Sequence, residues 1–289
     1  MPTESYLIVN ADDFGYDPGV NRGIIESARR GIVTATGIFA NAENLQEQVD
    51  MLRDIDHLDT GVHLNLTYGK PVAKGTLELT RAWGGSFPGK ATLLRALATG
   101  KMGVEAVKTE WRAQIERCLA SGVHVRFVNS HEHVHMLPGL FGVTRSLARE
   151  FGVPHVRVAV GEWRARPTVG SIARNALIDG MRMCIPSRSR DEAPIMIGLA
   201  ASGRLSLPYL ENTLKSLRKG GVYELMCHPG CTHGSLLKDP HLLHYHDWDG
   251  ERMALCSDEA GHLCEEFGIR LIGYRHLAVV GGRLEVRRS

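Results

Sequence analysis

The chain alternates short apolar segments, each long enough for one strand, with longer segments in which apolar residues recur at helical spacing. The strand-like segments are residues 6–10, 34–40, 61–66, 124–129, 155–160, 195–199, 222–227 and 270–273. The helical segments are residues 19–30, 45–52, 92–98, 104–120, 140–151, 171–183, 208–219 and 251–267. Strands and helices that alternate along a chain predict a parallel sheet covered by helices.

This pattern predicts an α/β fold, a distorted single-domain β/α barrel of about seven strands that spans residues 1–289. The chain length suits one large α/β domain. A doubly wound open sheet is the alternative, but no G-x-G-x-x-G motif follows the first strand, which disfavours its dinucleotide-binding form. Residues 70–103 interrupt the alternation and are interpreted as an insertion around one short helix. Residues 277–286 predict a final hairpin.

Composition excludes several classes of protein. The net charge of +2 disfavours a nucleic-acid partner, and no apolar run approaches the ~18 residues of a membrane span. The first residues lack the pattern of a signal peptide. Six scattered cysteines are interpreted as reduced thiols, so we expect a cytoplasmic protein.

Polar residues gather where predicted strands end. Asp12 and Asp13 follow the first strand, and His63 lies on the third. The segment 129–135, "NSHEHVH", follows another strand, and His228 ends a late one. Because the carboxyl ends of barrel strands share one face, these side chains are expected to converge there.

An aspartate and two histidines form a suitable ligand set for a divalent metal, and imidazole ligands favour zinc. Two adjacent carboxylates repel each other, but binding of one to a metal offsets its charge. The other can then accept a proton from water. The histidines of "HEHVH" would share one face of an extended segment, although not all three need bind a metal.

Other interpretations of these residues stay open. An Asp-Asp pair after a strand often forms a turn or a helix cap, and a single strand histidine such as His63 often belongs to the core. Residues 227–233, "CHPGCTH", could form a zinc knuckle with His241, His244 and His246, although no second cysteine pair follows at zinc-ribbon spacing.

Five motifs in order resemble the YdjC-like, or ChbG, carbohydrate deacetylases. They are "LIVNADDFG", "GIIESARRGIVTATG", "GVHLNLTYGKPV", "NSHEHVHMLP" and "ELMCHPG". The resemblance implies a hydrolase on a distorted β/α barrel that removes acetyl groups from N-acetylated sugars with one divalent metal cation. Magnesium is often assigned in this family, whereas the histidine ligands favour zinc.

The resemblance also implies roles for six residues. The expected metal ligands are Asp13, His63 and His131. Asp12 is the expected catalytic base, with Glu132 next should another residue serve, and His228 is expected beside the leaving group. Arg157 is placed to orient Asp12.

The stretch 197–230 resembles the deacetylases of hopanoid biosynthesis more than those acting on chitooligosaccharides. The expected substrate is therefore an N-acetylglucosaminyl hopanoid lipid, with a chitooligosaccharide as the alternative. A metal-dependent phosphoesterase and a non-catalytic sugar-binding protein are alternatives of other classes. Self-association into a homo-oligomer is a further expectation.

The segment 163–190 is both basic and amphipathic. Its arginines are Arg164, Arg166, Arg174, Arg182, Arg188 and Arg190. One interpretation is a solvated helix and loop over the barrel. The other is peripheral contact with the inner, anionic face of a membrane, which would admit a lipid-linked sugar.

Overall fold

Eight strands form one parallel sheet in the computed structural model, which describes residues 4–163, 168–237 and 239–287. The strands are β1 (Ser5–Phe14), β2 (Ala35–Ile38), β3 (Asp59–Leu64), β4 (Val125–Ser130), β5 (His155–Val156), β6 (Ile195–Ile197), β7 (Val222–Cys227) and β8 (Ile269–Leu271). A separate antiparallel hairpin joins β9 (Leu277–Val280) to β10 (Arg283–Val286), which confirms the predicted final hairpin. Arg164 and Arg166 lie outside the described residues.

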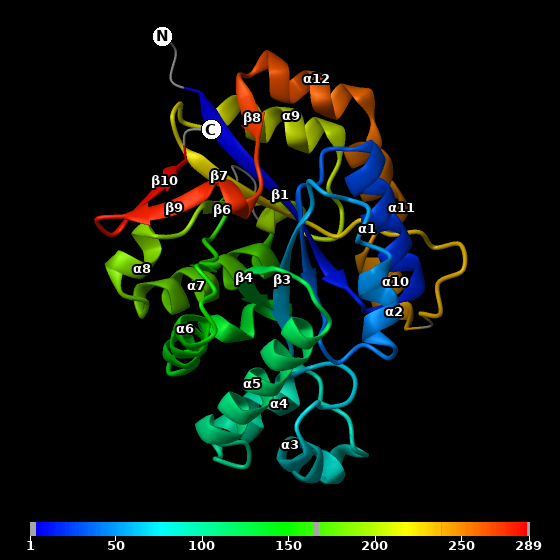
Figure 1. The fold of residues 1–289 in the computed structure, drawn as a ribbon, viewed down its shortest axis with the longest axis vertical. Helices are drawn as coiled ribbons and strands as arrows, with labels where there is room; N and C mark the ends of the chain where they lie inside the picture. The colour runs from blue at the N-terminus through cyan, green and yellow to red at the C-terminus, as the bar shows by residue number, and fades with distance from the viewer. Residues whose placement is uncertain (1–3, 164–167, 238, 288–289) are drawn as a thin grey trace.

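Helices cover the sheet between the strands (Figure 1). They are α1 (Pro18–Arg30), α2 (Leu45–Asp50), α3 (Lys74–Leu79), α4 (Lys90–Ala98), α5 (Val104–Ala120), α6 (Leu140–Glu150), α7 (Val169–Met183), α8 (Ser187–Asp191), α9 (Leu207–Ser216), α10 (Pro240–Tyr245), α11 (Trp248–Cys256) and α12 (Asp258–Glu266). The short 3-10 helices are η1 (Thr80–Trp83), η2 (His131–Met136), η3 (Leu199–Ala201) and η4 (Tyr274–His276).

The strand order confirms a distorted, open barrel. The sheet runs β5-β4-β3-β2-β1-β7-β6, and β8 pairs with the start of β1. In a closed β/α barrel each strand pairs with the next one along the chain, and the last pairs with the first. This sheet follows that order, but the described β5 and β6 do not pair, so the barrel is open between them. A doubly wound sheet would instead reverse its strand order near the middle.

Local sequence explains where the first helix begins. The side chain of Asp17 caps α1 by accepting a hydrogen bond from the backbone N–H of Gly19. Pro18 stands in the first turn, where its missing N–H costs nothing. Ile24 and Ala28 are buried on the inner side of the helix. The cap and the apolar stripe together fix α1 after the end of β1.

Side chains of β1 point alternately toward the helices and toward the concave side of the sheet. Leu7 and Val9 join the large apolar core under the helices, whereas Ile8 joins a smaller cluster. That cluster comprises Ile8, Ala35, Phe127, Ile272, Tyr274 and Leu277. Because side chains along a strand alternate between the two faces, Asn10 and Asp12 point to the same concave face as Ile8. This apolar cluster therefore fills the barrel at the amino ends of the strands, and polar residues occupy the carboxyl ends.

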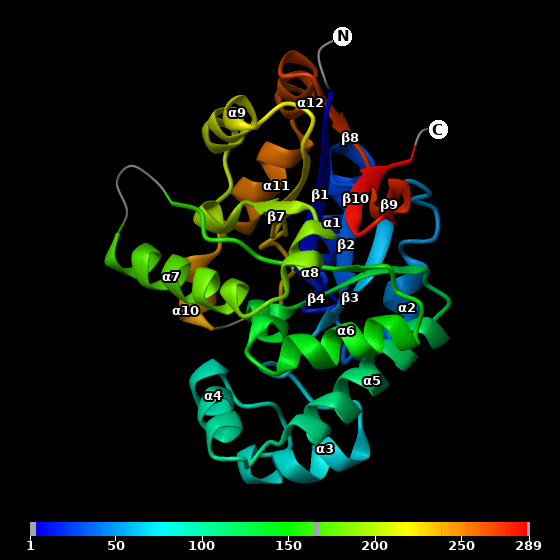
Figure 2. The ribbon, with the colours of Figure 1, turned by 90° about the vertical axis from the view of Figure 1, so that its left-hand side faces the viewer.

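The structure differs from the sequence predictions in three elements. Residues 251–267 form two helices, because Ser257 caps α12 by accepting from the N–H of Ala260. The strand predicted at 155–160 pairs only over β5. The insertion 70–103 contains α3 and η1 as well as the expected helix α4, and these elements lie at the end of the molecule away from both termini (Figure 2).

No described helix is both long and apolar enough to cross a bilayer. All six cysteines carry free thiols.

Candidate metal-centred active site

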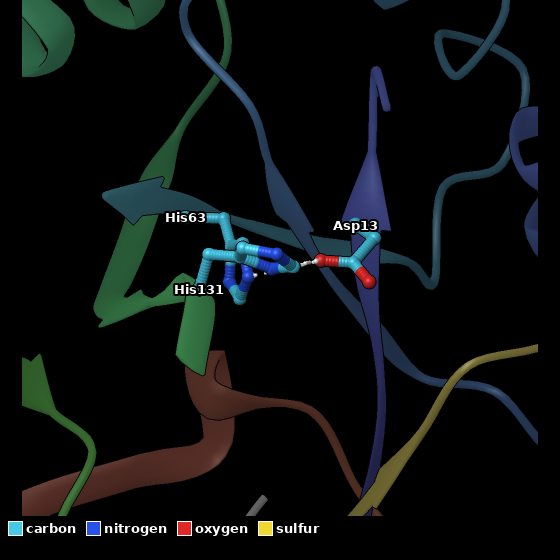
Figure 3. A group of neighbouring side chains, drawn as sticks. All are labelled: Asp13, His63 and His131. Carbon is cyan, nitrogen blue, oxygen red and sulfur yellow. Dashed lines mark hydrogen bonds and ion pairs between the residues drawn. The ribbon is translucent and has the colours of Figure 1, made fainter. Parts of the chain in front are cut away.

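Three strands bring Asp13, His63 and His131 together (Figure 3). Asp13 comes from β1, His63 from β3, and His131 from the first residue after β4. One possible ligand atom from each side chain lies within 4.8 Å of the other two. Within the described chain, no other set of three such side chains meets this criterion.

A bulge near the end of β1 allows two adjacent aspartates to face one site. The pairing of β1 with β2 shifts register between Ala11 and Phe14, and Asp13 has a φ of 76°. In a regular strand neighbouring side chains point to opposite faces. The left-handed backbone at Asp13 breaks this alternation, so its carboxylate joins that of Asp12 on the concave side. The aspartates thus belong to the strand itself rather than following it.

The geometry of the three side chains suits a cation. Asp13 Oδ1 lies 3.0 Å from Nδ1 of His131 and 3.1 Å from Nε2 of His63. His63 Nε2 is buried and makes no hydrogen bond to any described residue. Its contact with Asp13 does not meet hydrogen-bond geometry, and a metal ion would satisfy this buried nitrogen. The residues present therefore fit a divalent metal.

Charge explains how the pKa values in this group shift. Burial opposes ionisation of Asp13, but the neighbouring His131 and His63 hold its pKa well below the usual range. Burial alone would lower the pKa of His131, but the carboxylates of Asp13, Glu132 and Asp12 together outweigh this effect and raise it. The carboxylate is therefore ionised at neutral pH, as a metal ligand must be.

Asp12, next to this group, accepts hydrogen bonds from several buried side chains. Arg157, fully buried just after β5, donates from Nη1 to Asp12 Oδ2 over 2.6 Å and from Nη2 to Oδ1 over 3.0 Å. Its Nε donates to Glu224 on β7 over 2.6 Å. Burial would raise the pKa of Asp12, but Arg157, His63 and His228 together outweigh it and lower that pKa to about 2. Asp12 is accordingly an ionised acceptor with a fixed orientation.

His228 reaches the same cavity from the end of β7. Its backbone N–H donates to Glu251 over 2.6 Å, which fixes the turn that follows the strand. Its ring lies 5.3 Å from that of His246, which in turn stacks on Trp248. His228, Asp12, Asp13, His63 and His131 all line one cavity of about 850 Å³. Arg157 does not line it, since it lies behind Asp12.

The lining of the cavity combines apolar side chains with charged ones such as Lys90, Arg174 and Arg204. The apolar wall includes Leu137, Ile178, Met181, Leu199 and Leu242. These residues come from the segment after β4 and from α7, η3 and α10. A volume of this size lies near the upper end for small-molecule sites.

The expectation that "HEHVH" is extended is wrong. Residues 131–136 form η2, and Glu132 and His133 have φ values of 55° and 56°. His135 turns into the core, where its ring bonds Ser130 Oγ and the carbonyl of Arg157. Neither His133 nor His135 joins the group of Asp13. The kink therefore separates three histidines that a strand would have aligned.

The zinc-knuckle alternative has no support among the described residues, where the single candidate metal group is that of Asp13. Cys227 is buried and contacts the carbonyl of Asn10. Burial raises the pKa of its thiol well above the usual range, which disfavours the thiolate that zinc requires.

Sequence reasoning missed three polar residues of the site: Asn10, Asn129 and Glu224. All three are fully buried. Asn10 stands two residues before Asp12 on β1, and Asn129 of β4 stands two residues before His131, the first residue after that strand. This alternation with Asp12 and His131 is a signal that could have identified them.

The fold and the site define a β/α-barrel protein with a candidate metal centre at the carboxyl ends of its strands. The chain belongs to the YdjC-like protein family, whose profile matches residues 6–266. A carbohydrate deacetylase from Brevibacillus brevis is 38% identical over 148 residues, 51% of this chain and 57% of that protein. A carbohydrate deacetylase from Geobacillus stearothermophilus is 33% identical over 61% of this chain and 69% of its own.

A solved structure from Enterococcus faecalis is similar over nearly the whole fold. That protein, described as a proposed cellobiose-phosphate cleavage protein, is 28% identical with a TM-score of 0.69. The match covers 94% of this chain and 98% of the other. By contrast, the chain spans little more than half the length of the Brevibacillus relative.

Proposed function

We propose that this protein is a metal-dependent carbohydrate deacetylase that hydrolyses the acetamide of an N-acetylated sugar and releases acetate. The convergence of Asp13, His63 and His131 beside Asp12 carries this proposal. The deacetylase names of the relatives support the same reaction.

Asp13, His63 and His131 would hold the cation. Two imidazoles and one carboxylate leave positions open, as in catalytic zinc sites, so the ligand chemistry favours zinc over magnesium. When bound, such a cation supplies Lewis-acid polarisation of the acetamide carbonyl.

Asp12 would accept the proton of the attacking water. Arg157 bonds both of its oxygens, but Oδ2 accepts only the one bond from Nη1 among the described side chains. A lone pair of Oδ2 therefore remains for the proton. The salt bridge lowers the basicity of Asp12 while fixing where it points.

His228 would donate a proton to the departing sugar nitrogen. It lines the cavity from β7, whereas Asp12 comes from β1, so the two can act on different atoms of one acetamide. A general acid is needed because an amine leaves poorly as an anion.

The apolar wall supports a substrate with an apolar body, such as an N-acetylglucosaminyl hopanoid lipid. A chitooligosaccharide is polar along its whole length and would leave this wall without a partner. Leu177 of α7 lines the cavity and is 59% exposed, so its substitution by a polar residue should not disturb the core.

The experiment is an assay of acetate and phosphate release from N-acetylglucosaminyl lipids, chitobiose and sugar phosphates, with and without a chelator. Chelator-sensitive acetate release is expected, and Leu177→Gln should raise KM for the lipid-linked sugar alone. Phosphate release without acetate would favour the phosphoesterase. No metal-dependent turnover of any substrate would favour a sugar-binding protein, and equal KM changes for chitobiose would favour the chitooligosaccharide branch.

Peripheral membrane contact is a further proposal. Val169, Leu177 and Met183 of α7 are 85%, 59% and 79% exposed, and the same helix carries Arg174 and Arg182. This combination suits a helix that lies on an anionic surface. Flotation with anionic liposomes tests the proposal, and a protein that stays at the bottom would refute it. Cytoplasmic location, a single domain and self-association stay predictions.

A further inference from the structure

Asn129 links the two halves of the site. It stands on β4 directly opposite His63 of β3, and its side chain is fully buried. Its Nδ2 lies 2.8 Å from Asp12 Oδ1, and its Oδ1 lies 2.7 Å from His63 Nδ1. One carboxamide therefore touches both the candidate base and a candidate metal ligand.

The carboxylate fixes which way this amide points. An ionised carboxylate only accepts hydrogen bonds, so the amide nitrogen must face Asp12. The amide oxygen then faces His63 and can only accept. The proton of the neutral imidazole must consequently sit on Nδ1, which leaves a lone pair on Nε2.

That Nε2 is the atom without a hydrogen-bond partner that lies 3.1 Å from Asp13. The opposite tautomer would place a proton there, where it would occupy the lone pair that a metal needs. The bond from Nδ1 thus prepares Nε2 for coordination before any metal arrives.

The neighbouring strand leaves space for this bond. A Cβ at Gly37 of β2 would lie 3.1 Å from Asn129 Oδ1 and 3.2 Å from His63 Nδ1. These distances are too short for unstrained contact, so a side chain at position 37 would press on the bonded pair. The glycine has an ordinary φ, so space rather than backbone conformation accounts for it.

We propose that Asn129 is a positioning residue that commits His63 to the tautomer able to bind metal and at the same time anchors Asp12. Of the proposed function, the inference uses only the metal site. Asn10 provides the matched control, because its Nδ2 also donates to Asp12 Oδ1, over 2.7 Å, and no bond joins it to His63.

The test is Zn²⁺ affinity by chelator competition, measured on the full chain. Asn129→Leu should bind Zn²⁺ about 10–100-fold more weakly, as expected when a partner of a ligating histidine is lost. Asn10→Leu should bind with native affinity. Asn129→Asp keeps an acceptor for His63 and should also stay near native affinity, but it sets a second carboxyl group beside Asp12 and should lower turnover.

A second readout is the ¹⁵N spectrum of the zinc-free protein. His63 should carry its proton on Nδ1 in the native chain and populate both tautomers in Asn129→Leu. If the leucine variant does not fold, Asn129→Ala, which removes the same carboxamide, takes its place, and native Zn²⁺ affinity in that variant would overturn the proposal.

The remaining outcomes separate this inference from the function. Native affinity in Asn129→Leu, or an equal loss in Asn10→Leu, overturns the role of Asn129 while the metal site stands. A native chain that binds no Zn²⁺ overturns both. Zn²⁺ binding with the expected pattern but without acetate release supports Asn129 and refutes only the deacetylase.

Discussion

At the scale of single residues, Asp12 and Asp13 have different surroundings although they are neighbours in sequence. Asp13 faces two imidazole nitrogens, whereas Asp12 faces the guanidinium of Arg157. The environment rather than the residue type separates them, as in other sites with two carboxylates.

Asp12→Asn should retain metal and lose turnover about 10²–10⁴-fold, because an amide cannot take the proton of water. Metal content and acetate release, measured on the same preparation, check this. Glu132→Gln is the matched variant, since Glu132 is partly exposed and pairs with Lys90 over 2.9 Å. It should remain active. The reverse pattern would make Glu132 the base.

At the scale of elements, α1 packs directly on the loop that carries His228. The backbone N–H of Cys231 donates to the carbonyl of Gly19 over 3.0 Å. A Cβ at Gly23 would lie 2.2 Å from the Cα of Gly230. No flexible side chain can yield there, so the helix and the loop fit only without a side chain at position 23.

Gly23→Ala should destabilise the protein by about 1–3 kcal/mol through overpacking and should lower turnover by displacing His228. Metal affinity should stay native, because Asp13, His63 and His131 lie on other elements. Urea unfolding, acetate release and chelator competition measure the three effects.

Gly261→Ala is the control. Gly261 also lies inside a helix, α12, but no atom lies within 4 Å of an added Cβ. This variant should gain about 0.5–1 kcal/mol from helix propensity. Equal destabilisation of both variants would show that the contact with Gly230 does not matter.

At the scale of the whole molecule, buried neutral histidines couple stability to pH. Burial lowers the pKa of His135 to about 4, and burial with the nearby Arg287 lowers that of His155 to about 4. The ordinary pKa of a histidine side chain is 6.5. As pH falls below 6.5, these two histidines bind protons in the unfolded chain but stay neutral in the folded chain, so acidification favours unfolding.

The unfolding free energy of the metal-free protein should therefore fall as the pH drops from 6.5 to about 4. Above 6.5 it should fall with rising pH, because Asp13 raises the pKa of His131 in the folded chain. Each histidine contributes at most about 1.4 kcal/mol per pH unit. Asp12, with its lowered pKa, adds a loss only below 3.8 and lies outside this window. Urea unfolding across the interval measures the slope.

His155→Gln removes one of these titrations and should make the slope shallower. Its Nδ1 has no partner among the described residues, so little hydrogen bonding is lost. An unchanged slope in this variant, or stability that rises on acidification, would contradict the prediction.

The sequence by itself determined the fold class, most elements and the residues that could bind a metal. Periodicity identifies α5 and β7 at their observed bounds, because these elements bury one continuous face or lie in the centre of the sheet. Aspartate and histidine at strand ends are conspicuous because such residues are costly there without a ligand or a partner.

Only the tertiary structure decided how those residues are used. The kink in η2 and the bulge at Asp13 depend on contacts between strands that are distant in sequence, which local periodicity cannot report. Asn129 meets Asp12 across 117 positions and Glu224 meets Arg157 across 67, so their roles exist only once the barrel curls. A strand pattern fixes which way a side chain points, but the partner it meets depends on the curvature of the sheet.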